Sequence, residues 1–311
     1  MKLSVVIPCY RSENTISNVI SRTKKVFENN PKYDYEIICV NDGSPDGTSK
    51  VLHALAAKNG KIKVIDLARN FGQHSALMAG FNYVTGDTVI CLDDDGQTDP
   101  SDMLLLVSKI EEGFDIASAR YTQEHRSLLR RLGSKISMCM SHHLIGMPKN
   151  IELNSFCACK RFVLNEVVKY KNAFPFVHGL MLRATRNIAN VEMIRNDRES
   201  GNSGYTLRKL LGLWMNGFTA FSVAPLRIAG IIGAIVAILG FVYGAFLVVR
   251  KLMIPGISAG YSSIMAVVLF FFGLNMLFMG LIGEYIGRSY ICINEAPQYV
   301  IKELVNIEEQ S

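Results

Sequence analysis

The sequence lacks the glycine-rich motifs by which many nucleotide-binding proteins hold phosphate groups. No Gly-x-Gly-x-x-Gly follows the first apolar run, and no Gly-x-x-x-x-Gly-Lys-Ser/Thr occurs. These absences argue against a dinucleotide-binding Rossmann enzyme and against a P-loop nucleotidase. Phosphate chemistry in this chain would therefore depend on another motif.

The sequence also lacks the cysteine pattern of a disulfide framework. Its cysteines are odd in number, 7, and scattered, and the two that lie close together, Cys157 and Cys159, have no neighbouring histidine cluster that would complete a zinc site. We expect free core thiols and a reducing compartment. The first apolar run is too short for a signal peptide, so we expect no cleaved leader.

The sequence also lacks a strong net charge. The 33 Lys and Arg residues exceed the 27 Asp and Glu residues by only 6, and basic residues are not interleaved with aromatic ones. We therefore expect no nucleic acid as partner. With 19% charged residues, the mean hydropathy is nevertheless +0.21, so one part of the chain must be unusually apolar.

The first two thirds of the chain alternate β-branched runs with amphipathic stretches. Such alternation predicts an α/β fold with a doubly wound, mostly parallel sheet. The expected strands are residues 3–7, 36–40, 63–67, 88–92 and 114–118, and the expected helices are residues 15–27, 47–57, 100–112 and 128–144.

The last third contains two long runs without a charged residue, 228–249 and 264–282. As helices they would be about 33 Å and about 28 Å long, close to the thickness of a bilayer core. We expect two transmembrane helices, 228–249 and 264–286, joined by an extracytoplasmic loop, 250–263. Gly240 and Gly244 have a spacing suited to close helix contact, which favours a homo-oligomer.

The positive residues predict the orientation of these spans. Several precede the first span, and the loop between the spans holds only Arg250 and Lys251. We therefore expect a multi-pass protein of the cytoplasmic membrane, with its catalytic domain (1–205) and both termini in the cytoplasm. Residues 206–227 would form an interfacial amphipathic helix, and 287–311 a cytoplasmic tail.

Polar residues follow the predicted strands at the edge where an open parallel sheet binds ligands. Asp93 and Asp95 follow a buried strand, and alternate residues of an extended segment point the same way. Neighbouring carboxylates of this kind suit Mg²⁺ or Mn²⁺ bound together with substrate phosphates, and Gln97 could add a neutral oxygen ligand. An acidic, solvated turn before Pro100 is the alternative.

The order of motifs resembles glycosyltransferase family 2 with the GT-A fold. The segments that carry the resemblance are VVIPCYRSEN, VNDGSPDGT, NFGQHSALMAGF, DDDGQTDP, PLR before the apolar runs and GEYIGR after them. Within that family the chain is similar to dolichyl-phosphate mannose synthase. It is also similar to bacterial enzymes that charge undecaprenyl phosphate with aminoarabinose or glucose.

The resemblance implies roles for individual residues. Asp95, Glu152 and Arg198 would be catalytic, and Asp93, Asp95 and Gln97 would hold the metal. Arg198, Ser203 and Tyr205 would bind the acceptor phosphate. The donor would be bound by Pro8, Tyr10, Glu13, Asp42, Asn70, Gly72, Gly80, Asp93, Asp94 and Arg120.

The sequence departs from the family pattern at two positions. Glu152 stands where the family commonly has the shorter aspartate, which weakens its assignment as catalytic or positioning residue. Gly204 stands where the family often has Lys or Arg, so one phosphate contact is missing or comes from Arg208 or Lys209.

The resulting hypothesis is an inverting, metal-dependent transfer of a sugar from a nucleotide diphosphate sugar to polyprenyl phosphate at the cytoplasmic membrane face. The resemblance favours a UDP-sugar and leaves GDP and the identity of the sugar open. Two alternatives are a polysaccharide-synthase-type transferase with a sugar hydroxyl as acceptor, and an inactive scaffold that binds lipid-linked sugar.

Overall fold

The computed structural model describes residues 1–121, 151–193, 224–253 and 260–307. The chain divides into two compact units, residues 1–206 with 295–311, and residues 207–294. The predicted helix 128–144 and most of the predicted interfacial helix, 206–223, lie outside the described residues.

The first unit is built on one sheet of eight strands in the order β7-β5-β6-β4-β1-β2-β3-β8. Pairing is parallel across β4-β1-β2-β3 and between β5 and β7, and antiparallel where β6 and β8 join. The predicted α/β sheet is therefore confirmed, with more antiparallel pairing than expected. The strands are β1 (Lys2–Cys9), β2 (Asp34–Asn41), β3 (Ile62–Leu67), β4 (Thr88–Cys91), β5 (Ile116–Tyr121), β6 (Cys157–Lys160), β7 (Ile188–Met193) and β8 (Ile301–Val305).

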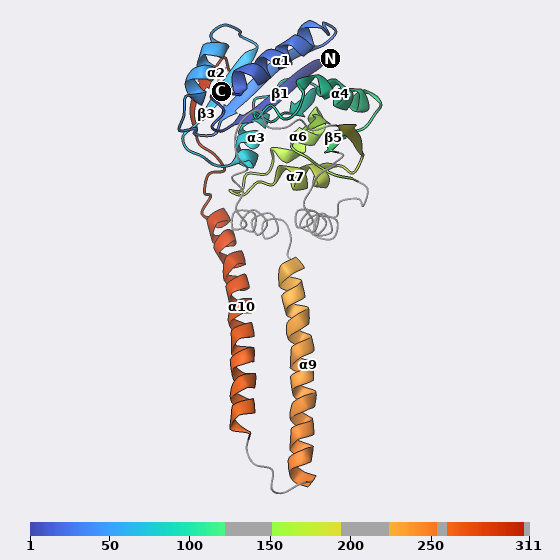
Figure 1. Cartoon of the computed structure of the whole chain (residues 1–311), viewed down its shortest axis with the longest axis vertical. Coiled ribbons are helices and arrows are strands. Elements are labelled where there is room, and N and C mark those ends of the chain that lie inside the picture. The colour runs from blue at the N-terminus through green and yellow to red at the C-terminus, as the bar shows by residue number, and fades with distance from the viewer. Residues whose placement is uncertain (122–150, 194–223, 254–259, 308–311) are drawn as a thin grey trace. The chain divides into compact units, whose positions relative to one another are not determined.

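Helices cover both faces of this sheet, which is why the central strands are buried along nearly their whole length. Helices α1, α2 and α4 pack on one face, and α3, α6 and α7 on the other (Figure 1). The helices are α1 (Ile16–Glu28), α2 (Thr48–Ala56), α3 (Gln73–Phe81), the 3₁₀ turn η1 (Pro100–Asp102), α4 (Met103–Glu111), α6 (Arg161–Val167) and α7 (Val177–Ala184).

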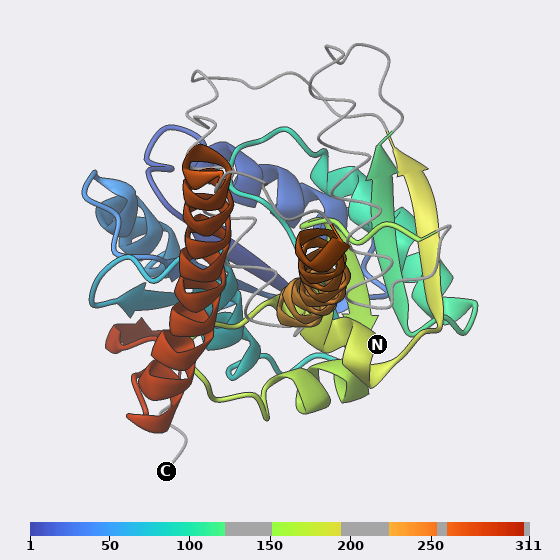
Figure 2. The same ribbon diagram turned by 90° about the horizontal axis from the view of Figure 1, so that it is seen from below.

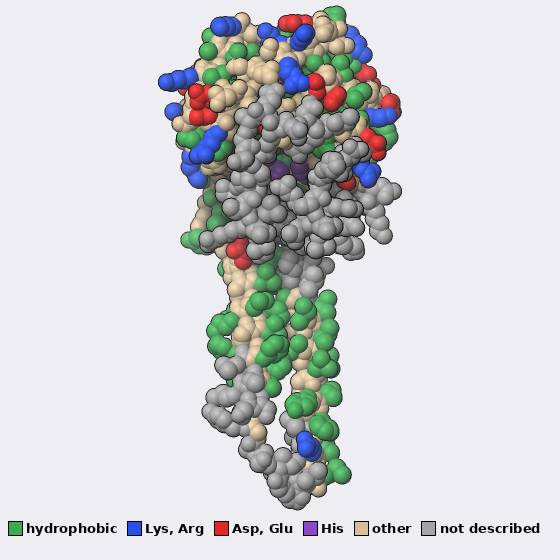
Figure 3. Space-filling model, in the orientation of Figure 1, with side chains coloured by type: hydrophobic (Ala, Val, Ile, Leu, Met, Phe, Trp, Pro, Cys, Tyr) green, Lys and Arg blue, Asp and Glu red, His purple; other side chains and the backbone are tan. Residues whose placement is uncertain are grey.

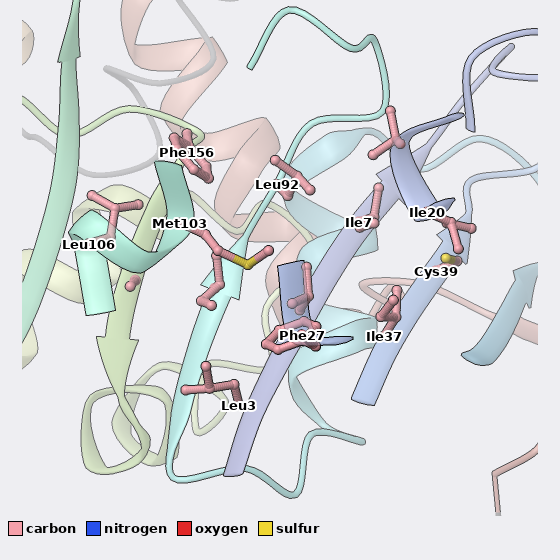
Figure 4. Packing of buried hydrophobic residues seen from close by; sticks show 14 of the residues in the cluster. Leu3, Ile7, Ile20, Phe27, Ile37, Cys39, Leu92, Met103, Leu106 and Phe156 are labelled. Atoms are coloured by element: carbon pink, nitrogen blue, oxygen red, sulfur yellow. The ribbon is translucent and has the colours of Figure 1, made fainter. Parts of the chain in front are cut away.

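The main apolar core lies between the sheet and helices α1, α2 and α4. Leu3 and Ile7 of β1 meet Ile20 and Phe27 of α1, and Met103 of α4 extends the same cluster (Figure 4). All five side chains are buried. Because β1 contributes to this core up to Cys9, packing fixes the carboxyl end of the strand.

The chain after the second long helix returns to the first unit. Strand β8 pairs with β3 and forms the edge of the sheet opposite to β5 and β7 (Figure 2). Gln298 is buried and donates to the backbone oxygens of Tyr170 and Asn172 at 3.3 and 2.9 Å. The segment predicted as a tail, 287–311, thus contains the end of a helix and one strand of the sheet.

The second unit contains two long helices, α9 (Ala224–Met253) and α10 (Tyr261–Ile293). Mean hydropathy is 2.2 over Ala229–Phe246 and 1.4 over Phe270–Ile293, and none of the side chains that the structure describes in these two windows is buried. Apolar side chains run along both helices, whereas charged ones are scattered over the surface of the first unit (Figure 3). Both helices extend beyond the predicted spans, so the connecting segment is shorter than the predicted loop 250–263.

Candidate functional site

The acidic loop after β4 meets the loop after β1. Pairing of β1 with β4 places Val6 opposite Cys91, so the residues after Cys9 lie beside Asp93 and Asp94. The Asp94 carboxylate accepts hydrogen bonds from the Tyr10 backbone amide, at 3.0 Å, and from the Ser12 hydroxyl. Burial raises the pKa of Asp94 to about 6, although these two hydrogen bonds oppose the shift.

Asp93 is held from two sides. Its Oδ1 accepts a hydrogen bond from Gln73 Nε2 at 3.1 Å, and its Oδ2 accepts one from the Ser155 hydroxyl. Sequence reasoning did not single out Gln73 or Ser155. Ser155 reaches Asp93 because antiparallel pairing of Cys91 with Cys157 brings residue 155 opposite residue 93, a register that the sequence alone does not show.

Asp95 and Gln97 form the far side of the acidic loop. Asp95 Oδ1 accepts a hydrogen bond from the Gln97 backbone amide at 3.1 Å, which closes a tight turn around Gly96. Gln97 Oε1 is buried and has no hydrogen-bond partner within the described part of the chain. Burial of an acceptor without a hydrogen-bond partner costs free energy, and coordination of a cation by this oxygen would offset that cost. Asp93, Asp95 and Gln97 therefore fit a divalent metal.

The Asp42 carboxylate stabilises the loop after β3. Its two carboxylate oxygens accept hydrogen bonds from the backbone amides of Phe71, at 2.7 Å, and Gly72, at 2.8 Å. Burial raises the pKa of Asp42, while the same hydrogen bonds act in the opposite direction. Gly43 (φ +58°) lets this turn approach closely, since a Cβ there would lie 2.3 Å from the carbonyl carbon of Arg69.

The other predicted donor residues have varied positions. Glu13 Oε2 accepts a hydrogen bond from the Gly47 backbone amide at 2.8 Å, which joins the loops after β1 and β2. Asn70 is exposed next to the Asp42-bound turn. Pro8 is buried within β1, and Gly80 lies inside α3, against Val6.

Arg120 and Glu152 lie together on the β5 side of the sheet. Arg120 Nε is 3.8 Å from Glu152 Oε1, and both side chains are partly exposed. The Glu152 backbone is held by Asn190, which donates from Nδ2 to the Glu152 oxygen and accepts from the Glu152 amide. Glu152, predicted to be catalytic, is thus paired with Arg120, which is predicted to bind the donor. Arg198, Ser203 and Tyr205 lie outside the described residues.

Two histidines lie beside the Asp93 partners. His74 follows Gln73, and His178 contacts the backbone of Asn154, the residue before Ser155. Their rings are 5.6 Å apart, and both pack edge-on against Phe176. Burial lowers the pKa of His74 to about 3 and that of His178 to about 4, so both are neutral at pH 7. Histidine side chains are visible on the face shown in Figure 3.

A second group of possible ligands, His53, Asp66 and Glu303, lies on α2, β3 and β8. His53 Nε2 is in direct hydrogen-bond contact with Asp66 Oδ2, and Asp66 Oδ1 accepts from Asn41 and Ser49. A nitrogen and an oxygen in direct contact fit a hydrogen-bonded pair better than two ligands spread around one ion. This group therefore gives no reason to place a metal away from the acidic loop.

Family models and named relatives both match this chain as a glycosyltransferase. Residues 4–168 match the family described as glycosyl transferase family 2, and residues 224–289 match the GtrB C-terminal hairpin. The chain is 33% identical over 99% of its length to an undecaprenyl-phosphate 4-deoxy-4-formamido-L-arabinose transferase of Proteus mirabilis, of which it covers 95%. It is 32% identical over its full length to the uncharacterized glycosyltransferase YkcC of Bacillus subtilis, of which it covers 96%.

Solved structures share the fold. The mannosyl-3-phosphoglycerate synthase of Rubrobacter xylanophilus has a TM-score of 0.56 at 19% identity, covering 74% of this chain and 75% of that one. The glucosyl-3-phosphoglycerate synthase of Mycobacterium tuberculosis, solved with Mn²⁺ and UDP-glucose, has a TM-score of 0.51 at 21% identity, covering 67% and 73%. The likeness supports a GT-A-type fold for the first unit.

Proposed function

Because the chain belongs to glycosyltransferase family 2, we propose that it transfers a sugar from a nucleotide diphosphate sugar to polyprenyl phosphate at the cytoplasmic face of the membrane. UDP-sugar is the favoured donor, and undecaprenyl phosphate is the favoured acceptor because curated relatives are named for that acceptor. The transfer would invert the configuration of the anomeric carbon.

The acidic loop carries this proposal. Asp93 is oriented between Gln73 and Ser155, and the buried Gln97 Oε1 has no partner among the described residues. With Asp95, these groups would hold Mg²⁺ or Mn²⁺ at the carboxyl end of β4. A divalent cation bound there would offset the negative charge that develops on the leaving nucleoside diphosphate.

The acceptor explains why a strong general base is not required. A phosphate monoester has a second pKa of about 6, so it is largely a dianion at pH 7 and already a competent nucleophile. Its charge must instead be neutralised as it approaches the donor. We assign that task to Arg198, Ser203 and Tyr205, and assign Arg120, with Glu152 as its partner, to the donor side.

The second unit supports a membrane location. Exposure of two apolar helices to water is unfavourable, and their transfer into a bilayer lowers the free energy. A polyprenyl tail stays in the bilayer whereas a nucleotide sugar stays in water, so transfer must occur at the interface. We further propose that both termini are cytoplasmic, and that the open surfaces at Gly240 and Gly244 pack against a second copy.

The test uses membranes containing the full chain, undecaprenyl phosphate, Mn²⁺ and a panel of radiolabelled nucleotide sugars. We expect one sugar to enter the lipid fraction with inverted configuration. Asp95→Asn should reduce transfer by about a hundredfold or more, because a neutral amide is a poor ligand for a hard cation. Gln97→Leu should raise the Mn²⁺ concentration needed for half-maximal rate about tenfold.

The matched control is Asp34→Asn. Asp34 is exposed at the start of β2 and pairs with Lys61 on the surface, where such pairs contribute little. It should transfer sugar at the wild-type rate, and all variants should insert into membranes equally. Transfer to a sugar hydroxyl only would instead support a polysaccharide synthase, and donor binding without any transfer would support a scaffold. Either result would contradict the proposal.

A further inference from the structure

We propose that Asp94, the middle residue of the acidic loop, is a positioning residue that sets donor affinity by holding the turn formed by Tyr10, Arg11 and Ser12. This inference rests on the proposed function, because it concerns the same donor site. It assigns to Asp94 a role that differs from those of its neighbours. Asp93 and Asp95 would serve the metal, whereas Asp94 would act through the loop after β1.

The hydrogen-bond partners of Asp94 and Asp93 support this division. The Asp94 carboxylate accepts from the Tyr10 amide, at 3.0 Å, and from the Ser12 hydroxyl. Asp93, in contrast, is bound by residues of α3 and of the segment before β6. Asp94 therefore contacts the loop after β1, whereas Asp93 contacts α3 and the segment before β6.

Ser12 connects this contact to two helices. Its side chain is buried, and its amide donates to Thr48 Oγ1, in the first turn of α2, at 2.9 Å. Its backbone oxygen accepts from the amides of Thr15 and Ile16, both at 3.0 Å, where α1 begins. Through Ser12, Asp94 thereby connects the acidic loop to the first turns of α1 and α2.

The turn itself needs such support. Arg11 has φ +58°, a conformation that residues other than glycine adopt rarely. A strained turn persists only where contacts on both sides hold it. On one side the Arg11 amide donates to Ser44 Oγ at 2.6 Å, and on the other Asp94 holds Tyr10 and Ser12.

The consequence for ligand binding lies in Tyr10. Tyr10 is 43% exposed although it directly follows β1, whose residues after Lys2 are all buried, and the Arg11 guanidinium lies 5.5 Å from the centre of its ring. An aromatic ring presented in this way suits stacking on a nucleoside base. Loss of Asp94 would free the turn, and the ring would have to be ordered again when the donor binds.

Kinetics of three variants of the full chain test this role. Asp94→Ala should raise the KM for the nucleotide sugar about tenfold and change kcat by less than about threefold. Asp94→Asn keeps an oxygen that accepts from the Tyr10 amide and the Ser12 hydroxyl, so it should recover most of the lost affinity. Ser12→Ala removes one of the two contacts and should have an intermediate KM.

Calorimetric binding of UDP with Mn²⁺ gives a second readout that needs no transfer. The variants should bind UDP in the same order as their KM values, at an unchanged Mn²⁺ requirement. If Asp94→Ala lowers kcat alone, or raises the Mn²⁺ requirement, Asp94 is a metal ligand and the proposal is wrong. If Asp94→Asn is as impaired as Asp94→Ala, the charge matters rather than the turn, which also overturns it.

The two proposals can fail separately. A wild-type chain that binds UDP but transfers no sugar to polyprenyl phosphate contradicts the proposed function, and the binding series still decides the role of Asp94. A wild-type chain that binds no nucleotide contradicts both. Should Asp94→Ala fail to fold, Ser12→Ala and Asp94→Asn still decide, because wild-type affinity for Ser12→Ala would mean that the turn does not need this contact.

Discussion

At the scale of single residues, the two neutral histidines beside the acidic loop, His74 and His178, make the stability of the folded chain depend on pH. Burial lowers the pKa of His74 and of His178, and for His74 the neighbouring His178 adds to the effect. A backbone contact with Asn154 acts in the opposite direction on His178. Their pKa values of about 3 and about 4 lie well below the ordinary value of 6.5 for an exposed histidine.

These shifts predict a loss of stability in mild acid. Below pH 6.5 the unfolded chain binds a proton at each histidine and the folded chain does not, so the stability present above pH 6.5 is lost as the pH falls towards 4. At pH 5 the loss should be at most about 2 kcal/mol for each histidine.

Chemical unfolding of the wild type and of His74→Phe at pH 7 and pH 5 measures this loss. Phenylalanine keeps the ring contacts with Phe176 and removes one titrating group, so the variant should lose about half as much stability as the wild type does. His74 Nδ1 has no hydrogen-bond partner in the described parts of the chain, so the replacement breaks no hydrogen bond of that atom. An equal pH dependence in both proteins would contradict the assignment.

At the scale of elements, α3 depends on one close approach to the sheet. A Cβ at Gly80 would lie 2.5 Å from Val6 Cγ1 and 3.2 Å from Val40 Cγ2. Only glycine lets the helix lie this near to β1 and β2. The helix in turn carries Gln73, which contacts Asp93, so its distance from the sheet affects the acidic loop.

Gly80→Ala should therefore lower stability by about 1–3 kcal/mol and reduce transfer, because the helix must move away from β1. Val6→Ala removes the Cγ1 atom that the new methyl group would strike. The double variant Gly80→Ala/Val6→Ala should then be more stable than the sum of the two single changes implies. Gly60→Ala is the control, since a Cβ at Gly60 meets nothing within 4 Å. Strictly additive effects in the double variant would refute the contact.

The elements also show what sequence reasoning could and could not reach. Runs such as 3–7 and 36–40 were recognisable as strands because both faces of β1 and β2 are covered and most of their side chains are apolar. Strand β8, Ile301–Val305, is an edge strand with two exposed charged residues, so its sequence carries no such signal. Its place became visible only through its pairing with β3.

The site divides in the same way. The acidic loop could be predicted because it follows a buried strand, and the fold that presents it follows from the alternation of strands and helices. The partners of its carboxylates could not, because they depend on register and on turns. Ser155 reaches Asp93 through antiparallel pairing, and Asp42 turns to the amides of Phe71 and Gly72 rather than outward.

At the scale of the whole molecule, the chain leaves the first unit before α9 and returns to it after α10. The returning segment is held by more than β8. Asn306 donates from Nδ2 to the backbone oxygens of Ala56 and Ile62, at 2.9 and 2.8 Å, and Ala68 donates its amide to the Val300 oxygen at 2.9 Å. Ala68 lies just before the loop that Asp42 binds, so the returning segment supports one wall of the proposed donor site.

A chain that ends after Asn294 should therefore keep both long helices and lose stability in the first unit. It would leave β3 as an unpaired edge and remove the contacts of Gln298 and Asn306, each worth about 1 kcal/mol. We expect the truncated protein to insert into membranes, to unfold at a lower denaturant concentration and to bind UDP more weakly. A chain that ends after Ile307 keeps β8 and serves as the control, which should match the wild type. Wild-type UDP affinity in the shorter chain would mean that the returning strand does not support the donor site, whatever it contributes to stability.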